Sequence, residues 1–258
     1  MVGIGIQARV DYDPDSDADA EFLCLLLYFR GSFEIFMPIY DISQTLSERI
    51  AVWPGDQKFR RRWSMRIREG QSCNVSAVTM SVHTGTHLDA PYHFDEAGSD
   101  IAGVSLRNFI GPARVVAVPA AQELICAPFL QGLDWRGVER VLFKTSASDI
   151  AEDRFERNFA FLTEDGAEFL AQRGLLLVGT DAPSVEAYDS KTLDCHKILS
   201  RHGISILEGT RLAQVPPGDY ELICLPLRLA GLDGSPVRAI LRRPDSGSKT
   251  PARSRSRL

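Results

Sequence analysis

The chain has 258 residues, of which 44% are hydrophobic and 24% are charged, so it can bury a sizeable core without disulfides or a structural metal. Its formal net charge of −5 disfavours general nucleic-acid binding, which needs a basic surface to displace counterions. No apolar run approaches the roughly 20 residues of a membrane-spanning helix, and the five cysteines form no Cys-x-x-Cys pair. We therefore expect a cytoplasmic protein with free thiols, whose partners are neither nucleic acid nor membrane.

The first 36 residues differ in composition from the centre of the chain. Acidic residues alternate over positions 11–21, and a short apolar run follows at positions 22–29, without the basic start of a signal peptide. We expect residues 1–36 to be an N-terminal extension and residues 37–243 to be the folded domain. One hypothesis is that Met37 is the native start and that the extension comes from an over-long gene model.

The central part of the chain has the pattern of a mixed α/β domain. Short apolar runs bounded by turn residues predict strands at residues 75–82, 113–118, 141–145, 175–178, 220–227 and 236–241. Helical spacing of apolar residues predicts helices at 164–173 and 192–202, which stop at Gly174 and Gly203. Residues 244–258 are basic and rich in Ser, Gly and Pro, which predicts a disordered tail.

Three of the five histidines fall within eleven residues: His83, His87 and His93. A glycine and a proline in this segment disfavour a long helix. In an extended segment His83, His87 and Asp89 would share parity and point the same way. Two imidazoles and one carboxylate after a predicted strand suit zinc, manganese or iron. His93 is either a further ligand or a proton carrier, since imidazole side chains are suited to acid–base work near neutral pH.

The remaining histidines lie on one predicted helix. His196 is in its middle, whereas His202 comes six residues later and would face well away, so we interpret His202 as a surface residue near the helix C-terminus. Glu208 ends the apolar run 204–207 and precedes Gly209. Its carboxylate is either solvated at a turn or directed at a site.

The segment His83-Thr84-Gly85-Thr86-His87-Leu88-Asp89-Ala90-Pro91-Tyr92-His93-Phe94 resembles the signature of the cyclase-family metal hydrolases. Similar segments occur in the family's order at residues 52–56 (Val-Trp-Pro-Gly-Asp), 184–193, 206–209, 218–223 and 235–239. The resemblance runs from about residue 37 to residue 242. Within the family, the chain resembles the bacterial kynurenine formamidases (arylformamidases).

This resemblance implies a fold and an activity. The fold is α/β: a swivelling β/β/α domain with a mixed barrel-like sheet and outer helices, one domain per subunit in a homo-oligomer that is at least a dimer. The activity is hydrolysis of N-formyl-L-kynurenine to L-kynurenine and formate, a step of tryptophan catabolism.

The resemblance also implies a site with two divalent metal ions, zinc or else manganese. Its five ligands would be His83, His87, Asp89, His196 and Glu208. Asp89 and Glu208 would bridge the two ions. His93 would carry protons, and Trp53 would contact the aromatic ring of the substrate.

Two other functions remain open from the sequence. One is a different amide hydrolase of the same family, such as an enzyme that opens the isatin ring. The other is a non-catalytic metal-binding protein, which an intact His93 disfavours because such a protein needs no proton carrier. A serine or cysteine hydrolase is disfavoured because no nucleophile-elbow motif is present.

Overall fold

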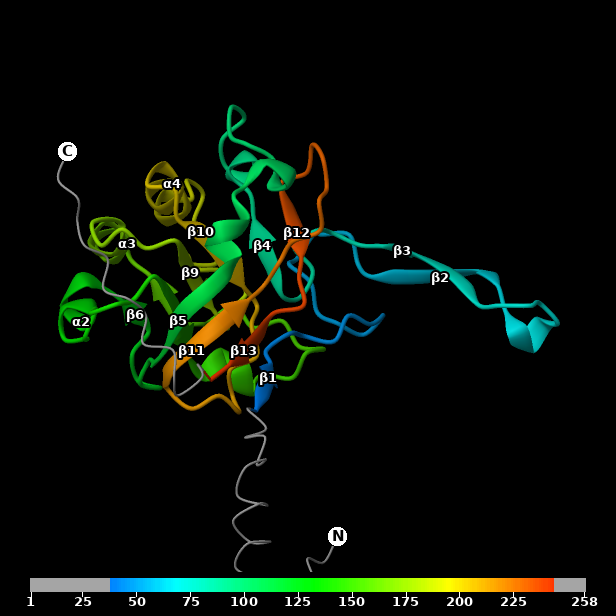
Figure 1. Ribbon diagram of the computed structural model, residues 1–258, viewed down its shortest axis with the longest axis horizontal. Helices are drawn as coiled ribbons and strands as arrows, with labels where there is room; N and C mark the ends of the chain where they lie inside the picture. The colour runs from blue at the N-terminus through cyan, green and yellow to red at the C-terminus, as the bar shows by residue number, and fades with distance from the viewer. Residues whose placement is uncertain (1–37, 244–258) are drawn as a thin grey trace, which may run out of the picture. The chain divides into compact units, whose positions relative to one another are not determined.

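The computed structural model describes residues 38–243, so the predictions for residues 1–36 and 244–258 lie outside the described residues. A nine-stranded sheet forms the centre of this part, in the order β1-β13-β11-β5-β7-β9-β10-β4-β12 (Figure 1). Its strands are β1 (Ile39–Asp41), β4 (His87–Asp89), β5 (Ile110–Ala117), β7 (Arg140–Lys144), β9 (Leu177–Thr180), β10 (Ser205–Glu208), β11 (Gly218–Ile223), β12 (Gly234–Pro236) and β13 (Ile240–Arg242).

Short helices and two small sheets complete the described part. The small sheets pair β2 (Arg60–Met65) with β3 (Val75–Thr79), and β6 (Leu124–Ile125) with β8 (Phe161–Leu162). The α-helices are α2 (Ala127–Gln131), α3 (Glu164–Ala171) and α4 (Asp194–Arg201). The 3₁₀ helices are η1 (Ile67–Glu69), η2 (Pro91–His93), η3 (Ile101–Gly103), η4 (Leu106–Phe109) and η5 (Ser146–Asp149).

The sheet is mixed and curls back towards itself. Strands β5, β7, β9 and β10 are parallel, whereas the strands outside them pair antiparallel. Residues 234–242 pair with β4 at one end of the strand order, through β12, and with β11 and β1 near the other end, through β13. One short segment therefore links both ends of the order, and the predicted mixed, barrel-like α/β fold is confirmed.

Strands β7, β9 and β10 are buried on both faces, which explains their apolar runs. Val141 and Phe143 of β7 pack with Leu170 of α3 and Leu199 of α4 in one core. Leu142, between them, points the other way into a second core inside the curled sheet. Helices α2, α3 and α4 lie together on the first side (Figure 1).

Most of the predicted elements form, with two instructive differences. The helices and the four strands at 113–118, 141–145, 175–178 and 220–227 are confirmed within a few residues. The single strand expected at 236–241 is wrong, because the chain bends between β12 and β13. In the bend the Val237 amide donates to the Thr86 carbonyl, while Ala239 accepts from Ile42 at the other end of the sheet.

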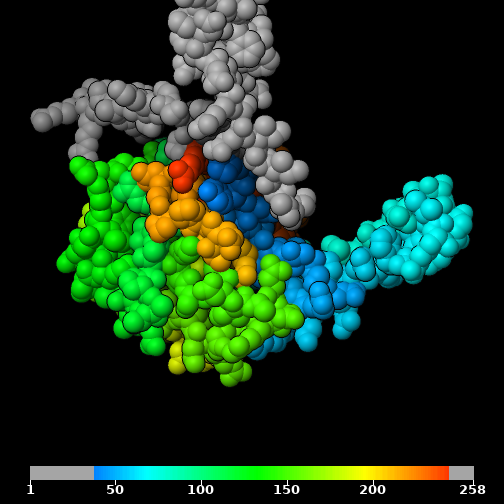
Figure 2. Space-filling view, turned by 90° about the horizontal axis from the view of Figure 1, so that it is seen from below, coloured from blue at the N-terminus to red at the C-terminus, as the bar shows by residue number. Residues whose placement is uncertain are grey.

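The strand expected at 75–82 is shorter and lies outside the central sheet. Within residues 38–243 it pairs only with β2, and the two form a hairpin that projects from the body formed by the central sheet (Figures 1 and 2). Every residue of β3 is exposed. We call residues 60–79 the hairpin arm. No helix within residues 38–243 has the length and apolarity to cross a membrane.

Candidate active site

Sheet register brings two of the expected ligands face to face. His87 and Asp89 stand at the two ends of β4, and both are buried. Strand β10 runs antiparallel beside β4 with Glu208 directly opposite His87. As a result, His87 Nε2 lies 3.5 Å from Asp89 Oδ1 and also 3.5 Å from Glu208 Oε2.

His83 reaches the same point from the turn before β4. The shared strand parity expected for His83, His87 and Asp89 therefore holds only for the last two, because residues 81–86 turn instead of continuing β3. His83 Nδ1 still lies 3.1 Å from Asp89 Oδ1. The turn depends on Gly85, whose φ is +70° and whose carbonyl accepts a hydrogen bond from His87 Nδ1 at 2.9 Å.

Helix α4 supplies the fourth expected side chain, His196. Its Nε2 lies 3.3 Å from Glu208 Oε1 and 3.8 Å from Asp89 Oδ2. Its Nδ1 donates to Glu186 Oε2 at 2.8 Å, and this contact fixes the plane of the imidazole. The structure thus brings His83, His87, Asp89, His196 and Glu208 together around β4, in two groups that share Asp89, and all of them except the half-buried His83 are buried.

The chemistry of this cluster fits divalent metal. Asp89 Oδ2 is buried and has no hydrogen-bond partner among residues 38–243, an arrangement that is unfavourable unless a cation binds there. Ligand atoms of His83, His87 and Asp89 lie within 4.8 Å of one another, as do those of Asp89, His196 and Glu208. Both sets combine imidazole with carboxylate, which suits zinc or manganese.

Electrostatics support the same conclusion. Burial raises the pKa of Asp89, but hydrogen bonds from His83 and His87 outweigh burial and hold that pKa well below its ordinary value. Burial lowers the pKa of His87, but Asp89 and Glu208 outweigh burial and raise it to about 10. The two buried carboxylates therefore attract positive charge, which a divalent cation bound by the same atoms would supply.

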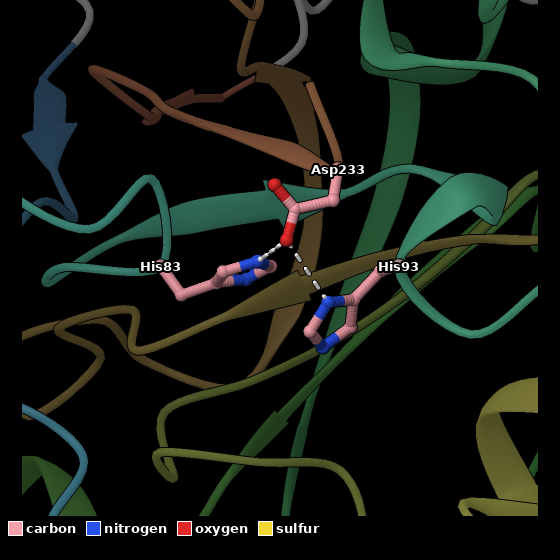
Figure 3. A group of neighbouring side chains, drawn as sticks. All are labelled: His83, His93 and Asp233. Carbon is pink, nitrogen blue, oxygen red and sulfur yellow. Dashed lines mark hydrogen bonds and ion pairs between the residues drawn. The ribbon is translucent and has the colours of Figure 1, made fainter. Parts of the chain in front are cut away.

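His93 lies in η2, beside the metal-type cluster. Its ring packs on that of His83 with centroids 4.1 Å apart, and its Nδ1 donates to Asp233 Oδ2 at 3.3 Å (Figure 3). His202 is elsewhere, as expected: it is exposed at the C-terminus of α4, where its Nδ1 donates to the Ile198 carbonyl at 2.9 Å.

One cavity of about 610 Å³ joins these groups to Trp53. It is lined by His83, His87, His93, His196 and Glu208. The Trp53 ring, which also lines it, is held by Tyr188 and Phe155, with ring centroids 5.0 Å and 5.4 Å away. An aromatic platform and a cluster of metal-type ligands therefore share one space, in which Lys191 adds a cation.

Two residues of the site were missed by sequence reasoning, namely Glu186 and Asp233. Neither has a histidine within five residues along the chain. The available signal was position: Glu186 directly follows Ser184 and Val185, and Asp233 stands two residues before Ser235, where segments of family similarity begin or continue.

Comparison with known proteins decides the family. The Cyclase family model matches residues 40–187. The kynurenine formamidase of Bacillus cereus is 46% identical over 202 residues, which cover 78% of this chain and 96% of that protein. The chain belongs to the Cyclase family. The resemblance seen in the sequence is thereby confirmed.

Solved structures agree with the Cyclase assignment. A structure described as a potential metal-dependent hydrolase with cyclase activity has a TM-score of 0.72 and 33% identity, and the match covers 81% of this chain and 99% of that one. Isatin hydrolase A from Labrenzia aggregata has a TM-score of 0.71 and 22% identity, covering 85% and 99%, and it shares the fold. The expectation of a metal-dependent amide hydrolase is confirmed by these relatives.

Proposed function

We propose that this protein hydrolyses N-formyl-L-kynurenine to L-kynurenine and formate. The observation that carries the proposal is the shared cavity, where Trp53 and His93 stand around the buried imidazole–carboxylate cluster. The substrate has an aromatic ring next to the formamide bond that breaks, so it needs an aromatic platform near an activated water. The kynurenine formamidase relatives, at 46% identity, support the same substrate.

We further propose that the cluster holds two divalent metal ions, zinc or alternatively manganese. His83 and His87 would bind one ion, His196 would bind the other, and Asp89 and Glu208 would bridge them. The shared position of Asp89 in both candidate ligand groups supports this division. When bound, the ions would activate a water molecule and polarise the formyl carbonyl.

The side chains around the cluster would perform the remaining chemistry. His93 takes a proton from the water as its oxygen attacks the formyl carbon. It then gives that proton to the aryl nitrogen as the C–N bond breaks, so the products are an uncharged aryl amine and formic acid, which ionises to formate and releases one proton to solvent. Trp53 stacks on the aryl ring and orients the formyl group.

Two broader proposals accompany the activity. The first is a homodimer or larger homo-oligomer, supported by the exposed apolar residues of the hairpin arm, such as Ile67 and Val78, which are 59% and 57% exposed. The second is a cytoplasmic location, supported by free thiols at Cys73, Cys126, Cys195 and Cys224.

Metal removal and reconstitution test the proposed activity. Chelation should abolish hydrolysis of N-formylkynurenine, and zinc or manganese should restore it. On the reconstituted protein, kcat/KM for N-formylkynurenine should exceed kcat/KM for isatin by roughly 10²-fold or more. Preference for isatin would assign the ring-opening function instead. Metal binding without hydrolysis of any aryl amide would indicate a non-catalytic metal-binding protein.

A further inference from the structure

We propose that Asp233 is a positioning residue for His93, a role that rests on the proposed function. A single carboxylate oxygen, Asp233 Oδ2, lies 3.3 Å from His93 Nδ1 and 2.9 Å from His83 Nε2 (Figure 3). Asp233 therefore contacts the expected proton carrier and an expected metal ligand through the same atom.

The backbone fixes Asp233 to the ligand strand. Its carbonyl accepts a hydrogen bond from the Ala90 amide at 2.9 Å, and the next residue, Gly234, pairs in register with Asp89. A Cβ at Gly234 would lie 3.0 Å from Cε1 of His83, so glycine lets that ring lie close to the strand. The carboxylate is thus held at a defined distance from the metal-type cluster, although it comes from a distant part of the sequence.

The contact with Asp233 decides which nitrogen of His93 can act as a base. A neutral imidazole carries one proton, and a carboxylate beside Nδ1 favours the tautomer with that proton on Nδ1. The lone pair then resides on Nε2, the nitrogen on the other side of the ring. The His93 ring packs against that of His83 with a centroid distance of 4.1 Å and an interplanar angle of 36°, which limits rotation of the His93 ring.

The same contact would matter again after proton uptake. Once His93 has taken a proton from water it is a cation, and a charge-assisted hydrogen bond to Asp233 stabilises it until the proton passes to the aryl nitrogen. The His93 side chain is 31% exposed and that of Asp233 is 39% exposed, so solvent screens part of this attraction. Fixing the tautomer is therefore the larger expected contribution.

The contact with His83 suggests a competing role. Hydrogen bonds to the outer nitrogen of a ligand histidine raise metal affinity. Asp233 also forms a candidate metal-ligand group with His83 and His93, whose ligand atoms lie within 4.8 Å of one another. If Asp233 served mainly to hold metal, its replacement would release metal. If it positions His93, its replacement would slow proton transfer while metal stays bound.

The test combines Asp233→Asn, His93→Ala and the double variant. We expect Asp233→Asn to retain metal, to lower kcat by roughly 10–10²-fold and to change KM by less than about threefold. In the His93→Ala background the same replacement should lower kcat by less than about twofold, because the two residues act as one unit. Asp95→Asn, near His93 in the chain but outside the cavity, should match the wild type in both metal content and kcat.

A spectroscopic readout makes the test independent of turnover. In the zinc-loaded protein, nitrogen-15 NMR of the histidine rings should show His93, assigned by its loss in His93→Ala, protonated on Nδ1. Asp233→Asn should shift it towards a mixture of tautomers. Three results would each overturn the proposal. They are release of metal from Asp233→Asn, a double variant whose loss of kcat equals the product of the two single-variant losses, and a His93 tautomer that Asp233→Asn leaves unchanged. If the wild type does not hydrolyse N-formylkynurenine, the proposed function is overturned instead. The same comparison of the two single variants and the double variant would then be made with formanilide or isatin as the substrate.

Discussion

The contacts of His87 show how much of the site depends on single atoms. Its Nδ1 is occupied by the Gly85 carbonyl at 2.9 Å, so only Nε2 remains to face Asp89 and Glu208. His196 is arranged in the same way, with Glu186 on Nδ1 and Glu208 near Nε2. In both residues the partner on the outer nitrogen selects the nitrogen that can bind metal.

Replacement of single residues should separate metal binding from proton transfer. Asp89→Ala and Glu208→Ala should each lose metal, because each removes a buried carboxylate that faces more than one imidazole. His93→Ala should keep metal while kcat falls by roughly 10²–10⁴-fold. Metal content by mass spectrometry and steady-state kinetics would measure both. Full metal occupancy in both carboxylate variants would contradict the bridging roles, and a fully active His93→Ala would contradict the proton-carrier role.

Lys191 should recognise the carboxylate of the amino-acid group of N-formylkynurenine. It lines the cavity, and within residues 38–243 no hydrogen bond or ion pair engages its ammonium, whereas Arg154 in the same cavity is paired with Glu156. Lys191→Gln should raise KM for N-formylkynurenine by roughly twofold to fivefold, the effect of losing one solvent-exposed charge pair.

Formanilide lacks the carboxylate and provides the control substrate, for which Lys191→Gln should leave KM unchanged. Lys197→Gln, an exposed lysine on α4 outside the cavity, provides the control variant. An equal change for both substrates would indicate that Lys191 acts on the site in general and does not read the carboxylate.

The residues of the site were predictable where the sequence clusters them. His83, His87 and Asp89 stand close together along the chain, so their spacing alone indicates metal. His196 and Glu208 needed the family resemblance, because nothing local separates a ligand from a buried histidine or a turn glutamate. Asp233 needed the structure, since it joins His93 only through the pairing of β12 with β4.

At the scale of elements, burial explains which strands could be predicted. Strands such as β7 and β9 are buried on both faces and therefore have continuous apolar sequences. The three-residue strands β4, β12 and β13 are too short for a periodic pattern, although β4 and β12 build the site. The hairpin arm has strand-like residues but no core beneath it. Its sequence could therefore predict a strand but not that this strand lies outside the central sheet.

The junction between β9 and η5 should make stability depend on pH through Asp181. This buried carboxylate accepts hydrogen bonds from the Thr145 amide at 2.8 Å, the Thr145 hydroxyl at 2.6 Å and the Ser148 hydroxyl at 2.7 Å. Burial, only partly offset by these bonds, raises its pKa from 3.8 to about 6. Between these pH values the folded protein holds a proton that the unfolded chain has lost.

The stabilising contribution of Asp181 is therefore fully present below about pH 4 and is lost as the pH rises through about 6. We expect the free energy of unfolding of the wild type, relative to Asp181→Asn, to fall by about 3 kcal/mol between those limits. Urea denaturation of both proteins at a series of pH values, with saturating metal, measures the difference and cancels the titration of other groups. A difference that does not vary with pH would contradict this account.

At the scale of the whole molecule, the described part combines a well-packed body with an arm that contributes no residue to the hydrophobic cores. A two-stranded hairpin alone is marginally stable in water. The hairpin arm nevertheless exposes Ile67, Val75 and Val78 by 59%, 42% and 57% of their surfaces. Apolar side chains on a projecting hairpin are typical of a contact with another subunit, and a second copy of this chain is the partner that the proposed homo-oligomer supplies.

Charge placed on the arm should therefore dissociate the proposed oligomer. Val78→Asp would bury an unpaired carboxylate in the contact, which is strongly unfavourable, so sedimentation should shift from dimer or larger towards monomer. Leu106→Asp is the matched control, because Leu106 is also 59% exposed but lies in η4, outside the arm. If both variants sediment like the wild type, the arm is not the contact between subunits. If only Val78→Asp dissociates, comparing its kcat with that of the wild type shows whether a neighbouring subunit contributes to the cavity.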